Sequence, residues 1–69
     1  MSVHFFKEKK KLKRKLLLLC GMVEENLNRA VKAVEDNDEA LSREVLQRDA
    51  EVDDREVEIE EECLKILAL

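Results

Sequence analysis

Nine carboxylates crowd the fourteen residues from Asp49 to Glu62 in the stretch RDAEVDDREVEIEEEC, which spans residues 48–63. Four of them follow a spacing of four, three and four residues: Asp49, Asp53, Glu56 and Glu60. On a helix this spacing stacks the side chains along one line, because residues three and four apart share a face. Carboxylates held together in this way repel one another and favour a cation, a proton or a metal ion beside them.

This row of four carboxylates, the acidic stripe, offers a metal ion oxygen ligands along one line of the helix. Hard oxygen ligands that project from bundle helices are how carboxylate metal sites are built. One stripe supplies only one side of a coordination shell, so we expect further ligands from another helix or subunit. The competing interpretation is a helix face neutralised by salt bridges from Arg43, Arg48 and Arg55.

Composition excludes several classes of protein. The chain has 69 residues, of which 43% are charged, with no Pro, one Gly and one His. An all-β fold and a Gly-rich phosphate loop are therefore disfavoured, and the length allows one domain at most. No nucleophile–base pair stands out around His4, so an enzyme is the least favoured class. Cys20 and Cys63 have no metal-ligand spacing, and we expect buried, reduced thiols.

Two amphipathic patterns predict two long helices. Apolar residues recur at helical spacing in the first pattern, at Leu12, Leu16, Leu19, Val23, Leu27, Ala30 and Val34. They recur again in the second, at Leu41, Val45, Val52, Ile59, Cys63 and Ile66. Between them Asn37 suits a helix C-terminus and Asp38 suits an N-cap. We predict helices over about 5–36 and 39–67, antiparallel because the connection is so short. Gly21 within the first helix is expected to allow close helix approach, or else a local bend.

A hairpin of two helices buries only one seam, yet the second predicted helix has another apolar edge. This edge comprises Leu46, Ala50, Val57 and Leu64. The final stretch CLKILAL is still apolar where the sequence stops. We therefore expect either a piece of a larger bundle or self-association into at least a dimer, a homo-oligomer that completes a helical bundle. As domain organisation, we predict a single hairpin over residues 1–69 and no second domain.

Charge is distributed unevenly along the chain. Residues 1–22 carry a net charge of +6 and residues 23–69 a net charge of −10. The basic run over residues 7–15 could bind nucleic acid or anionic lipid, but antiparallel packing places it beside the acidic end of the second helix, and we favour that pairing. The apolar run over residues 16–19 is too short for a signal or membrane-spanning segment, which predicts a cytoplasmic protein with at most peripheral membrane contact.

The sequence of the second predicted helix resembles that of PhoU proteins, a family whose helical hairpins carry the acidic signature D-x-x-x-D-x-x-E. Here the signature is Asp49, Asp53 and Glu56, followed by Ile59-Glu60 and the terminal Leu67-Ala68-Leu69. The first helix, HFFKEKKKLKRKLLLLCGMVEENLNRAVKAV, is similar to the opening of PhoU proteins. The resemblance covers essentially the whole chain, but it stops after two helices of one three-helix repeat.

The resemblance implies a regulator rather than an enzyme. The family architecture that the resemblance implies is two tandem three-helix bundles. Their acidic motifs are associated with iron, zinc, magnesium or manganese, that is, with a divalent or iron-type ion. Carried over to this chain, Asp49, Asp53 and Glu56 are the metal-ligand candidates, with Glu60 as a weaker one. The implied role is negative regulation of phosphate uptake and the phosphate-starvation response, with a sensor histidine kinase and the ATPase of a phosphate transporter as partners. A small structural oligomer without a ligand is the alternative.

Overall fold

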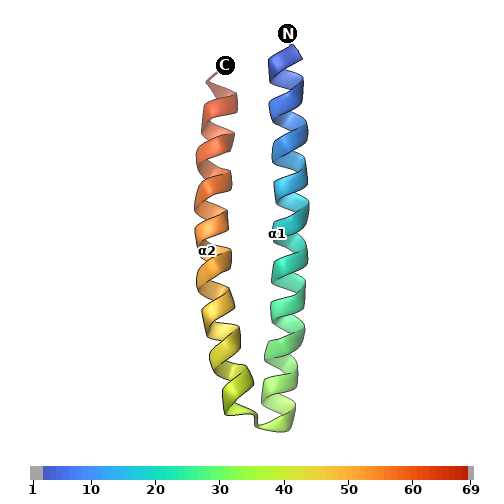
Figure 1. Ribbon diagram of the computed structural model, residues 1–69, viewed down its shortest axis with the longest axis vertical. Helices are drawn as coiled ribbons and strands as arrows, with labels where there is room; N and C mark the ends of the chain where they lie inside the picture. The colour runs from blue at the N-terminus through green and yellow to red at the C-terminus, as the bar shows by residue number, and fades with distance from the viewer. Residues whose placement is uncertain (1–2, 69) are drawn as a thin grey trace.

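The computed structural model describes residues 3–68, which form two helices joined by a tight turn (Figure 1). Helix α1 spans Val3–Asp36 and helix α2 spans Glu39–Leu67. The helices are antiparallel, so both ends of the chain lie at the same end of a rod measuring 53 × 15 × 11 Å. The predicted all-α hairpin is confirmed, although α1 begins at Val3 rather than near residue 5.

The turn ends one helix and starts the next with the residues that the sequence indicated. Asn37 has φ 52°, a left-handed conformation that Asn tolerates better than most side chains. The Asp38 N–H bonds the Ala33 carbonyl and the Asn37 N–H bonds the Val34 carbonyl, which is a Schellman motif. The Asp38 side chain then accepts a hydrogen bond of 3.0 Å from the Leu41 N–H and caps α2.

The seam between the helices is thin. Within the described residues its buried apolar side chains are Ala33, Val52 and Ile59. The apolar face predicted for α2 is confirmed, since Leu41, Val45, Val52, Ile59, Cys63 and Ile66 are all buried or half-buried.

The apolar face predicted for α1 is only partly right. Leu12, Leu19 and Ala30 are half-buried. Leu16, Val23, Leu27 and Val34 are instead exposed, with 63% of Leu27 and 81% of Val34 accessible. The seam follows four residues of α1 that are spaced seven apart: Leu12, Leu19, Asn26 and Ala33. A single neighbouring helix cannot cover the wider apolar stripe of α1 as well.

Two further expectations about single residues are wrong. A Cβ at Gly21 would meet no atom within 4 Å, so Gly21 does not serve a close approach of the helices. Cys20 is exposed and Cys63 half-buried, so the two thiols are free but not both buried.

Neither helix has a stretch long and apolar enough to cross a membrane within residues 3–68.

Candidate functional site

The acidic stripe lies on the surface of α2. Asp49, Asp53, Glu56 and Glu60 are all exposed. At a rise of about 1.5 Å per residue, the stripe extends over about 16 Å of the helix. The predicted alignment therefore gives a long charged row and not a compact cluster.

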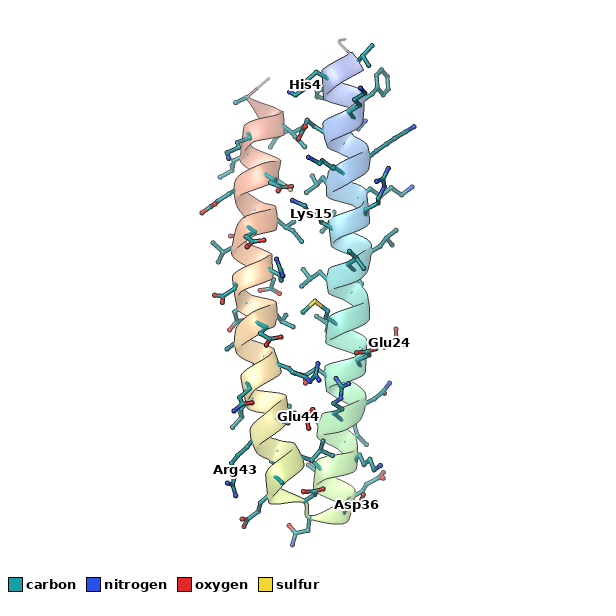
Figure 2. The ribbon with its side chains drawn as sticks, in the orientation of Figure 1. His4, Lys15, Glu24, Asp36, Arg43 and Glu44 are labelled. Carbon is teal, nitrogen blue, oxygen red and sulfur yellow. The ribbon has the colours of Figure 1, made fainter. Side chains whose placement is uncertain are left out.

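The arginines of α2 do not neutralise this row. Arg48 pairs with Glu44 at 3.3 Å, Arg55 pairs with Glu58 at 3.1 Å, and Arg43 pairs with Glu39 at 3.7 Å. All three cations thus bind carboxylates outside the stripe. Figure 2 shows Arg43 pointing away from α1, consistent with a pair on the outer surface. The interpretation of a salt-bridged stripe is therefore wrong, because within residues 3–68 no stripe carboxylate has an ion-pair partner.

The described side chains do not by themselves form a metal site. No three His, Cys, Asp or Glu residues in the part of the chain that the structure describes converge closely enough to hold an ion. The physical reason is that four carboxylates strung along one helix all approach a ligand from the same side. The metal site predicted at Asp49, Asp53, Glu56 and Glu60 stays a prediction that needs oxygen ligands from another helix.

A groove of about 230 Å³ lies beside the first carboxylate of the stripe. It is lined by Val23, Asn26, Leu27, Ala30, Val45, Asp49 and Val52. Both helices therefore contribute apolar walls, and Asp49 brings a charge to the same opening. The groove places Asp49 of the stripe beside Val23 and Leu27 of the exposed row of α1, and we call this side of the hairpin the open face.

Asn26 is the polar residue of the seam that the sequence analysis missed. It is only 6% exposed, and its Nδ2 donates a 3.2 Å hydrogen bond to the Val45 carbonyl. Its Oδ1 is buried and accepts no hydrogen bond from the residues that the structure describes. The signal was present in the sequence, since Asn26 continues the spacing of seven residues set by Leu12 and Leu19.

An ion pair joins the basic end of α1 to the acidic end of α2. Lys15 reaches from α1 toward α2 (Figure 2), and its Nζ binds Glu62. This contact agrees with the predicted match between the two ends. Lys9 lies 5.5 Å from the centre of the Phe5 ring, in a cation–π contact on the same helix. His4 is exposed at the start of α1.

An all-α hairpin whose apolar residues are only partly covered has the architecture of a helical-bundle protein. Comparison with known families agrees with this class. The model of the PhoU domain family matches residues 16–69. The chain belongs to the PhoU domain family, and the resemblance read from its acidic signature is confirmed.

Curated relatives extend the match over nearly the whole chain. A protein of Pseudomonas aeruginosa named phosphate-specific transport system accessory protein PhoU homolog is 37% identical over 68 residues, covering 99% of this chain and 28% of the relative. The PhoU homolog 1 of Thermotoga maritima is 38% identical over 66 residues, covering 96% and 28%. The PhoU protein of Escherichia coli is 32% identical over 68 residues, covering 99% and 28%.

The chain thus spans less than a third of the length of these relatives. No solved structure matches the chain.

Proposed function

We propose that the hairpin is a regulatory module of phosphate uptake that acts by binding in the cytoplasm and not by catalysis. The observation that carries this proposal is the similarity to phosphate-specific transport accessory proteins over 99% of the chain. Supporting it, the open face combines exposed apolar side chains with unpaired charge, as a surface for protein contacts does.

The proposed partners are a sensor histidine kinase and the ATPase subunit of a phosphate transporter. The match reaches both helices of the hairpin, so the proposal assigns binding to the hairpin as a unit. We also propose that the hairpin acts as a dimer or a higher homo-oligomer, because a two-helix unit leaves most of its apolar residues uncovered.

A reporter for the phosphate-starvation response tests the proposal in a bacterium whose own accessory protein is deleted. The wild-type hairpin is expected to lower reporter activity in phosphate-rich medium. Ile59→Asp is the control, because it places a charge in the seam where Ile59 is buried and so unfolds the hairpin. Equal reporter activity with the wild-type and control chains, both expressed, would contradict the proposal. Binding to the purified kinase and ATPase, measured by calorimetry, identifies the partner.

A further inference from the structure

We propose that the outer surface of α1, near the start of the helix, binds the headgroup surface of an anionic lipid bilayer. This surface, which we call the basic face, comprises the exposed residues Val3, Phe6, Lys7, Lys10, Lys13, Arg14 and Leu17. The match to the PhoU domain begins at residue 16, so most of the basic face lies outside it. The proposal therefore goes beyond the regulatory role proposed above and does not depend on it.

Helix geometry turns the basic face away from α2. In this part of α1 the half-buried residues, which face α2, are Phe5, Glu8, Leu12, Lys15 and Leu19. Successive residues are about 100° apart around a helix, so a residue two positions away lies nearly opposite. Lys10 is two positions from both Glu8 and Leu12. Nitrogen-tipped side chains accordingly extend from this part of α1 on the side away from α2 (Figure 2).

This orientation keeps the basic face exposed in a larger helical bundle. A further helix that packs in a groove between α1 and α2 contacts the flanks of the seam, as the groove beside Asp49 would require. The basic face lies on the opposite side of α1 from the seam. A helix that covers the groove therefore leaves the basic face open to a partner.

Acidic side chains do not neutralise the basic face. Glu8 is the only acid among residues 3–23, and it lies on the side of α1 that faces α2. Of the cations within residues 7–15, Lys15 alone has an ion-pair partner among the described residues, and that partner is Glu62. The basic face thus presents positive charge over about 21 Å of helix, which favours an anionic partner.

The side chains among the cations favour a lipid surface over a nucleic acid. Val3, Phe6 and Leu17 are each more than half exposed. Cations beside exposed Phe and Leu are typical of helices that lie in a bilayer interface, where apolar side chains enter the acyl boundary and lysines reach the headgroups. Nucleic-acid surfaces also use amide and hydroxyl side chains. Residues 3–23 contain no Asn, Gln, Ser or Thr.

Co-sedimentation of the 69-residue chain with lipid vesicles tests the proposal. We expect no binding to phosphatidylcholine vesicles, and binding once about 30% phosphatidylserine is included. We expect Lys10→Gln/Arg14→Gln to lower the partition coefficient at least ~10-fold, because each cation near an anionic surface contributes to binding. Phe6→Ser/Leu17→Ser is expected to lower it at least ~5-fold with no change of charge, which distinguishes a bilayer from other polyanions.

A matched control removes the same charges near the turn. Lys32 and Arg43 are both exposed there, and Lys32 is about 33 Å along α1 from Lys10, beyond the screening length of about 10 Å. Lys32→Gln/Arg43→Gln is therefore expected to bind anionic vesicles within ~3-fold of the wild type. Circular dichroism checks that every variant is helical.

Three outcomes would overturn the proposal: no binding to anionic vesicles, equal binding to neutral vesicles, or an equal loss in the control pair. A chain that binds a DNA duplex but not vesicles would identify a nucleic acid as the partner instead. These measurements use purified chain and lipid, so their outcome is separate from that of the reporter experiment.

Discussion

Asn26 combines burial with an unmet hydrogen bond, which makes it a weak point of the hairpin. An unsatisfied buried acceptor costs about 1–3 kcal/mol, and the bond from Nδ2 to Val45 returns only about 1 kcal/mol. Replacing Asn26 by Leu removes the unmet acceptor and adds apolar contact in the seam. We expect Asn26→Leu to raise the free energy of unfolding by about 1–2 kcal/mol, measured by urea unfolding at fixed protein concentration.

Asn28 provides the control for this substitution, because it is exposed on the same helix. Asn28→Leu is expected to change the free energy of unfolding by less than about 0.5 kcal/mol. A lower urea midpoint for Asn26→Leu would show that the bond to Val45 stabilises the seam more than the unmet acceptor costs. A polar residue at a core position can also fix helix register, so the variant is expected to gain stability while it loses uniqueness of pairing.

At the scale of single residues, the sequence predicted how the stripe carboxylates align, but it did not fully predict which acids the arginines bind. The spacing of Asp49, Asp53, Glu56 and Glu60 correctly placed them on one face of a helix. Helical spacing leaves Arg43 one acid in reach, Glu39. It leaves Arg48 a choice of Glu44 or Glu51, and Arg55 a choice of Glu51 or Glu58. Spacing therefore already directs all three arginines away from the stripe, and side-chain geometry decides only between the two acids open to Arg48 and to Arg55.

One substitution at the scale of the elements, Gly21→Ala, should stabilise α1 although the added methyl group contacts no other residue. Gly21 lies within the helix, has an ordinary negative φ, and has open space where a Cβ would project. Gly is destabilising inside a helix by roughly 0.5–1 kcal/mol relative to Ala. We expect Gly21→Ala to raise the free energy of unfolding by that amount, measured by urea unfolding. An unchanged or lower value would reveal a covered site at Gly21 in the assembled protein.

The elements themselves were the most predictable feature of the chain. Long runs of helix-forming residues with one break at Asn37-Asp38 leave few alternatives, and both residues act in the turn as expected. The inward face of α1 was harder to predict because its apolar stripe is wider than one neighbouring helix can cover. The row with Asn26 and the small Ala33 lies in the seam, and the row with Leu27 and Val34 is left open.

At the scale of the molecule, the hairpin has one filled seam and one unfilled face. Few apolar side chains are buried within residues 3–68, whereas many leucines and valines remain exposed to solvent. This imbalance was visible in the sequence as a second apolar edge on α2. The sequence could not show that Val23 and Leu27 of α1 line one groove with Asp49, because that depends on how each helix is rotated about its own axis.

The one-sided stripe leads to a prediction about metal ions. We expect that treatment with a chelator, and then addition of magnesium, manganese, zinc or iron, will leave the mass and thermal midpoint of the isolated chain unchanged. Asp49→Asn/Asp53→Asn is expected to raise the midpoint by about 1–3 °C, because removing a like-charge pair four residues apart gains a few tenths of a kcal/mol. Light scattering and circular dichroism measure both quantities.

The outer carboxylates give a control for the metal response. Glu51→Gln/Asp54→Asn removes two exposed charges that lie outside the stripe and should respond to metals as the wild type does. If a metal raises the midpoint of the wild type and this control but not of Asp49→Asn/Asp53→Asn, the stripe binds that ion in the isolated chain. The missing ligands would then come from a second copy, since one helix reaches an ion from one side only.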